Sequence, residues 1–181
     1  MGFSQEDESE KPEAAWENPV LVIVRGIKYN ESYKMLTGGI CMGSYLNPGC
    51  KGFEESLNSA IYVDKTGLIE KVNAVVDTRQ KYICVSRPRR FGKSMATDML
   101  AAYYDQSVDT ARLFDTLQIA KAETYQKYRN QYDVLKVNMQ EFLSRTKNIY
   151  ELLDRMKRLV LRDLKREYPN VDYLSLIHIS E

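Results

Sequence analysis

The sequence is poor in histidine and cysteine, and it has no hydrophobic run long enough to cross a membrane. Cys41, Cys50 and Cys84 are odd in number and show no C-x-x-C spacing, which argues against a disulfide scaffold and against a zinc site. This usage predicts a reducing, cytoplasmic setting. The apolar run at residues 20–24 is too short for a signal segment or a membrane span, so we expect no membrane partner.

The charges of the chain are nearly balanced. Lysine and arginine together number 26 against 25 aspartate and glutamate residues, which leaves a formal net charge of +1. The whole molecule therefore has no electrostatic field that would indicate a nucleic-acid or membrane partner. With 44% hydrophobic and 28% charged residues over 181 positions, the composition is typical of one globular domain with its own core.

The C-terminal end looks foreign to the rest of the chain. The peptide LSLIHISE at residues 174–181 resembles the translation of a sequencing-library adapter, and we expect the natural protein to continue past Tyr173. The alternative is a short natural strand. If the peptide is an adapter, His178 is foreign, and because it is the only histidine, no histidine-based catalysis or metal binding remains.

The N-terminal end allows two interpretations. Gly38 and Gly39 precede Met42 as a translated ribosome-binding site would, so residues 1–41 are interpreted as a translated leader or disordered tail. The competing interpretation is a genuine acidic tail followed by one edge strand. Under either interpretation, residues 42–173 form the N-terminal part of one domain.

Helix and strand patterns alternate through this domain. Helices are expected over about 68–76, 93–104 and 148–168, and strands over 82–86 and 134–139. Shorter helical turns are expected over 53–58 and around 111–117 and 122–132. The run YICVS at 82–86 has the continuous apolar character of a strand that is buried on both faces. The alternation predicts an α/β fold: a P-loop NTPase-like three-layer domain with a mostly parallel sheet.

The segment RPRRFGKS at residues 87–94 joins the predicted strand to the following helix. A Walker A motif, G-x-x-x-x-G-K-[ST], needs this context, because main-chain N–H groups and the helix N-terminus surround the phosphates while its lysine reaches them. Arg87 stands in place of the first glycine. We predict that ATP and Mg²⁺ bind here, the metal through the hydroxyl of Ser94, and that the binding residues are Arg89, Arg90, Phe91, Gly92, Lys93 and Ser94.

Two other interpretations of this loop stay open. Six cations between Arg79 and Lys93 come without an intervening acid, which is also the pattern of a basic patch that binds nucleic acid. The loop could also belong to a packing scaffold that has lost nucleotide. Neither alternative requires a glycine and a serine at the start of a helix, and this favours nucleotide binding.

Three segments resemble the N-terminal half of the bacterial AAA-ATPase-like proteins: MGSYLNPGCKGFEESLNSAIYVDKTGLIEK, YICVSRPRRFGKSMATDMLAAYYD and YDVLKVNMQEFLSR. The resemblance runs from Met42 to about Asn170 and implies a nucleotide partner bound at residues 87–94. Such proteins often carry a C-terminal PD-(D/E)XK nuclease-like domain, which implies nucleic acid as a second partner. Asp64 matches the family within YVDKT, and we expect it to have a structural role at a helix start.

One part of the family pattern has no counterpart. Its Walker B segment, an apolar strand ending in acidic residues, is absent, so the domain is expected to be truncated before that strand. Residues 134–139 do not replace it, because Lys136 and Asn138 interrupt the apolar run. Hydrolysis needs an acid that holds Mg²⁺ through water and a residue that orients the attacking water. The catalytic residues are therefore unknown, and we expect an ATP-binding fragment without measurable turnover.

Overall fold

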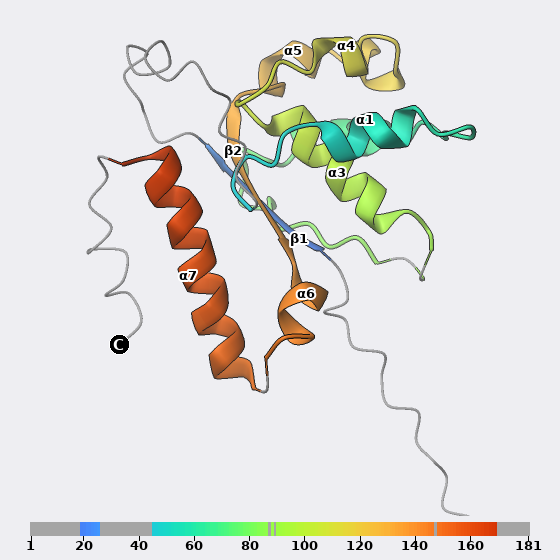
Figure 1. The fold of residues 1–181 in the computed structure, drawn as a ribbon. Coiled ribbons are helices and arrows are strands. Elements are labelled where there is room, and N and C mark those ends of the chain that lie inside the picture. The colour runs from blue at the N-terminus through green and yellow to red at the C-terminus, as the bar shows by residue number, and fades with distance from the viewer. Residues whose placement is uncertain (1–18, 26–44, 87, 89, 147, 170–181) are drawn as a thin grey trace, which may run out of the picture.

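The computed structural model describes residues 19–25, 45–86, 88, 90–146 and 148–169. Figure 1 shows β1 and β2 at the centre, with α7 on one side of them and α1 and α3 on the other. The elements, in chain order, are β1 (Pro19–Arg25), α1 (Lys51–Leu57), α2 (Gly67–Asn73), α3 (Lys93–Tyr104), α4 (Ala111–Phe114), the 3-10 helix η3 (Gln118–Lys121), α5 (Tyr125–Tyr128), β2 (Tyr132–Asn138), α6 (Met139–Leu143) and α7 (Ile149–Glu167).

The sheet consists of two antiparallel strands, β1 and β2, paired from Pro19 opposite Asn138 to Arg25 opposite Tyr132. The expected three-layer domain with a mostly parallel sheet is therefore wrong for the described residues. Residues 82–86 are not a strand, and Tyr82 is 87% exposed. Strand-forming side chains do not make a strand by themselves, because its stability comes from contacts with a neighbouring strand. β1 falls within residues 1–41, whose interpretation as a translated leader stays a prediction.

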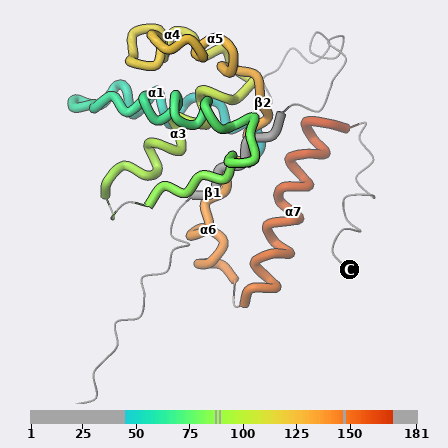
Figure 2. Tube along the Cα trace, turned by 180° about the vertical axis from the view of Figure 1, so that it is seen from behind, coloured from blue at the N-terminus to red at the C-terminus, as the bar shows by residue number. Residues whose placement is uncertain are grey.

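The side chains of β2 alternate between two helical layers. Tyr132 and Val134 are buried in a cluster with α3, whereas Val137 is buried in a separate cluster with α7. This period of two residues is that of a strand covered on both faces. Figure 2 shows from behind that α3 and α7 lie on opposite sides of β2. Lys136, which interrupts the apolar pattern, lies on the α3 side and forms an ion pair with Asp98 of that helix. A charged residue within β2 is thus neutralised by α3.

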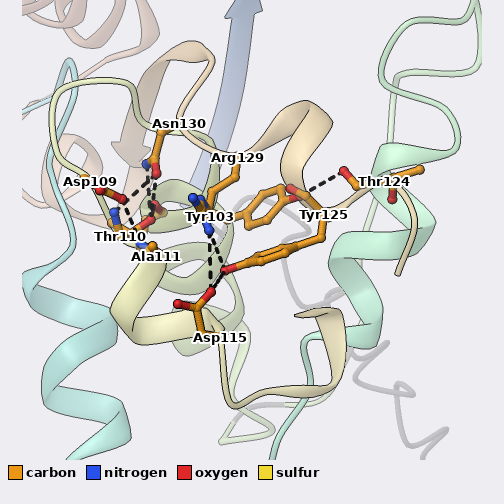
Figure 3. Close-up of polar contacts among 10 residues, drawn as sticks. Tyr103, Asp109, Thr110, Ala111, Asp115, Thr124, Tyr125, Arg129 and Asn130 are labelled. Atoms are coloured by element: carbon orange, nitrogen blue, oxygen red, sulfur yellow. Dashed lines mark hydrogen bonds and ion pairs between the residues drawn. The ribbon is translucent and has the colours of Figure 1, made fainter. Parts of the chain in front are cut away.

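The C-terminal end of α3 lies deep in the larger cluster. Tyr103 and Tyr104 are 0% exposed, and their rings meet edge to face with centroids 4.9 Å apart. The Tyr103 hydroxyl donates to the main-chain oxygen of Tyr125 at 2.7 Å, an arrangement visible in Figure 3. The Tyr104 hydroxyl donates to Oδ1 of Asn73 at 2.5 Å. These side chains therefore bury large aromatic surfaces without leaving their hydroxyls unpaired.

Asn130 fixes the chain that returns from α3 to β2. Its φ of 54° lies in the left-handed region, which asparagine tolerates better than most residues. Its Nδ2 donates to the main-chain oxygens of Asp105 at 2.6 Å and Val108 at 2.8 Å. Its Oδ1 accepts from the main-chain N–H of Thr110 at 3.2 Å, next to the Tyr103 contacts in Figure 3. One side chain thus satisfies several main-chain groups of this loop.

Buried carboxylates attach α7 to the rest of the fold. Oδ2 of Asp163 accepts from the main-chain N–H of Tyr45 at 2.8 Å. Burial acts to raise the pKa of Asp163, but this N–H and the Arg162 guanidinium outweigh burial and lower the pKa. Oδ1 of Asp133 on β2 accepts from the hydroxyl of Tyr168, which follows the last residue of α7.

Sequence periodicity located several of these helices. α3 has the expected bounds, and α7 begins after Asn148, whose side chain accepts from the main-chain N–H of Glu151 at 2.9 Å. The helical turns expected around 122–132 are confirmed by α5, although the last residue of that range, Tyr132, already belongs to β2. Among the helices of the described part of the chain, none is long and apolar enough to cross a membrane.

Candidate functional site

The predicted phosphate-binding loop leads directly into α3. Gly92 is the residue before the first helical turn, with a φ of 78°, and Arg90 has a φ of 65°, so both adopt the left-handed conformation. Helical hydrogen bonding begins where the N–H of Ala96 donates to the Gly92 oxygen at 2.9 Å. Gly92 has no side chain that could accept from the N–H groups of the first turn. Arg87 and Arg89 lie outside the described residues.

The structure brings the four other binding residues to this end of α3. Lys93 and Ser94 are the first two helical residues, and Ser94 is exposed while Lys93 is half-buried. Arg90 is exposed and Phe91 is 60% exposed. First-turn amides, the positive end of the helix dipole and two cations together favour a phosphate group. The exposed hydroxyl of Ser94 is an oxygen ligand of the kind that Mg²⁺ accepts beside its waters, so these residues fit a magnesium-bound phosphate.

The segment before the loop differs from the expected context of the motif. Residues 82–86 line an open hollow together with side chains of α2, which include Leu68 and Val72. Ile83 is 46% exposed and Val85 is 37% exposed. The motif's context is therefore present on the helix side of the loop and differs on the strand side.

Lys65 stands against this loop, although the motif spacing did not identify it. A Cβ atom on Gly92 would lie 3.1 Å from the Lys65 ammonium nitrogen. The ammonium is therefore beside the Gly92 backbone, where α3 begins. The one sequence signal for Lys65 is its place in YVDKT, but neither periodicity nor spacing indicates that this segment and the loop meet in the fold.

Asp64 fixes the turn that carries Lys65. Its Oδ1 accepts from the main-chain N–H of Thr66 at 2.8 Å and from the Thr66 hydroxyl at 2.7 Å, while its Oδ2 accepts from the Gln118 N–H at 2.7 Å. Partial burial acts to raise the pKa of Asp64, but the Gln118 and Thr66 donors outweigh it and lower the pKa. The Thr66 hydroxyl accepts from the Ile119 N–H at 3.1 Å and does not cap its own helix. The structural role expected for Asp64 is confirmed.

The carboxylate of Asp98, near this end of α3, already has a partner in another element. Asp98, one turn after Ser94, is paired with Lys136 of β2. Over the residues that the structure describes, no group of three or more histidine, cysteine, aspartate or glutamate side chains is arranged to hold a metal ion. The described part of the site therefore supplies groups for binding phosphate, and a Mg²⁺ ion here would depend on Ser94, phosphate and water.

Comparison with known proteins gives a family match. A family model described as a predicted AAA-ATPase matches residues 49–177. This range covers most of the chain and includes the loop at 87–94. No curated protein and no solved structure matches the chain significantly.

Proposed function

The chain belongs to the predicted AAA-ATPase family, and on this premise we propose that residues 87–94 are a Walker A-type loop that binds ATP with Mg²⁺. The observation that carries the proposal is the placement of Gly92, Lys93 and Ser94. Gly92 adopts a left-handed conformation directly before α3, and the lysine and serine open that helix. A phosphate at this position would accept from amides that the helix itself leaves unpaired.

Each residue of the loop would contribute a different interaction. The Lys93 ammonium would neutralise the β- and γ-phosphates, and the Ser94 hydroxyl would contact Mg²⁺. The main-chain N–H groups of Phe91 and Gly92 would donate to phosphate oxygens. Arg89 and Arg90 would add positive charge that screens the polyphosphate. A bound Mg²⁺ would neutralise phosphate charge and hold the polyphosphate in one orientation.

Thermal unfolding in the presence of Mg·ATP tests this proposal. A ligand that binds only the folded chain raises the unfolding midpoint, and at a concentration of about 100 times Kd we expect a rise of about 5–10 °C. Lys93→Ala should remove the rise. Lys121→Ala is the matched control, because it removes an exposed lysine from η3 and should leave the rise unchanged.

Binding of a single-stranded oligonucleotide separates this function from the basic-patch alternative. Nucleic-acid binding through surface cations weakens steeply with salt and does not depend on ATP. If the chain binds the oligonucleotide in this way, while Mg·ATP leaves the unfolding midpoint of the wild type unchanged, the nucleotide proposal is wrong.

A further inference from the structure

Lys65 is held in place by its neighbours on both sides. Thr66 is 0% exposed, and Asp64 is bonded to both Thr66 and η3. The main chain at Lys65 is therefore fixed by the folded core, although its own side chain is exposed. From this turn the side chain reaches the Gly92 backbone, where a Cβ would come within 3.1 Å of the ammonium nitrogen.

The position of this ammonium is electrostatically unfavourable in the free chain. The N-terminus of a helix carries partial positive charge, and a cation there is destabilised. Lys93, which follows Gly92, adds a second positive charge. The adjacent carboxylate of Asp64 is directed toward Thr66 and Gln118, from which its two oxygens accept hydrogen bonds. Within the described residues, no ion pair joins Lys65 to a carboxylate.

An anion at the Gly92 backbone would convert this repulsion into attraction. The first-turn amides, Lys93 and Lys65 would then all face one negative group from different segments of the chain. Charge-assisted hydrogen bonds of this kind are about twice as strong as neutral ones.

We propose that Lys65 is a second phosphate-binding cation, which donates from outside the loop to the polyphosphate bound at Gly92. This inference rests on the proposed function, since the phosphate is that of the nucleotide. Lys65 recognises the charge of the phosphate chain and makes no contact with the base. Substitution of Lys65 therefore lowers the affinity for inorganic tripolyphosphate and the affinity for ATP by the same factor.

Calorimetric titration of the full chain with Mg·ATP and with Mg·tripolyphosphate tests the role of Lys65. For Lys65→Ala, we expect both affinities to fall about 10-fold, as for the loss of one charge-assisted hydrogen bond. Lys65→Arg keeps the charge and should stay within about threefold of the wild type. Lys121→Ala, the matched control, should bind both ligands as the wild type does. Urea unfolding of each variant checks that the exposed substitution leaves the fold intact.

The outcomes separate this inference from the proposed function. If Lys65→Ala binds Mg·ATP as the wild type does while Lys93→Ala loses binding, the proposed role of Lys65 is wrong and the proposed nucleotide site is supported. If Lys65→Ala loses affinity for ATP but keeps its affinity for tripolyphosphate, Lys65 contacts the nucleoside and the phosphate role is wrong. If the wild type binds neither ligand, both proposals are wrong.

Discussion

The two ends of α3 are built in opposite ways. At the C-terminal end, Tyr103, Tyr104 and Asp105 are 0% exposed, and their side chains are hydrogen-bonded to other parts of the chain. Burial raises the pKa of Tyr103 to about 12, so its hydroxyl stays neutral at any physiological pH. At the N-terminal end, Phe91 is 60% exposed and Met95 is 40% exposed. One end of the helix is core, and the other is surface.

This difference separates the groups that stabilise the fold from those available to a ligand. A polar group that is hydrogen-bonded within the core contributes to the free energy of unfolding, whereas a binding group has to keep its hydrogen-bonding capacity for the ligand. The buried end also gives α3 a fixed direction, and this direction places its first turn. We therefore expect substitutions at the buried end to lower the free energy of unfolding and those at the exposed end to change affinity.

The largest expected effect is at Tyr104. Tyr104→Ala removes a fully buried ring and its hydrogen bond to Asn73, and we expect a loss of about 4 kcal/mol in the free energy of unfolding. Urea denaturation measures it. Tyr150→Ala is the control, because that tyrosine is 80% exposed on α7 and should change the free energy by less than about 0.5 kcal/mol. Similar losses in the two variants would contradict the burial argument.

Smaller changes in stability are expected for glycine substitutions of the left-handed residues near the two ends of α3. Asn130 and Arg90 have φ values of 54° and 65°, so glycine relieves backbone strain at both positions. Asn130→Gly also removes hydrogen bonds to Asp105 and Val108, and we expect it to destabilise the chain by about 2 kcal/mol. Arg90→Gly loses no such hydrogen bond to the part of the chain that the structure describes, and it should stabilise the free chain by about 0.5 kcal/mol.

Urea denaturation of both glycine variants without nucleotide measures this difference. The opposite signs are the test, because backbone strain alone would make both substitutions stabilising. If Arg90→Gly destabilises the chain as much as Asn130→Gly does, the exposed end contributes to stability and the contrast between the two ends is wrong.

The sequence was sufficient where a pattern is local. α3 was located with its bounds because Gly92 precedes it and its apolar residues recur at helical spacing. α7 was located because its apolar residues recur at helical spacing and Pro169 follows its end. The placement of Lys93 and Ser94 on the first turn of α3 followed from the same spacing.

The sequence was insufficient where distant segments meet. Residues 82–86 have the composition of a buried strand, but composition does not supply the neighbouring strand that pairing requires. β2 pairs with β1, which no spacing rule indicates. Lys65 lies beside Gly92 because the Asp64 turn is bonded to η3, so its place depends on three segments at once. Such contacts depend on tertiary structure and leave no period in the sequence.

The smallest expected effect concerns pH and the turn at Asp64. Because the pKa of Asp64 is lowered in the folded chain, the unfolded chain binds more protons in acid, and the stabilisation by this carboxylate is lost as the pH falls below its ordinary pKa of 3.8. An asparagine at this position has one amide NH2 group in place of a carboxylate oxygen. That group is a donor and would face the Thr66 or the Gln118 donor, so a hydrogen bond would be lost. We expect Asp64→Asn to lower the unfolding midpoint by about 2 °C between pH 5 and pH 7.

Calorimetric scans from pH 7 to pH 3 check this expectation. Asp163, whose pKa is also lowered, is present in both proteins, so its titration cancels in their difference. The gap between wild type and Asp64→Asn should therefore narrow below about pH 4 as the Asp64 carboxylate becomes protonated. A gap that stays constant down to pH 3 would show that the lost stability is steric and that the charge of Asp64 does not hold the turn beneath Lys65.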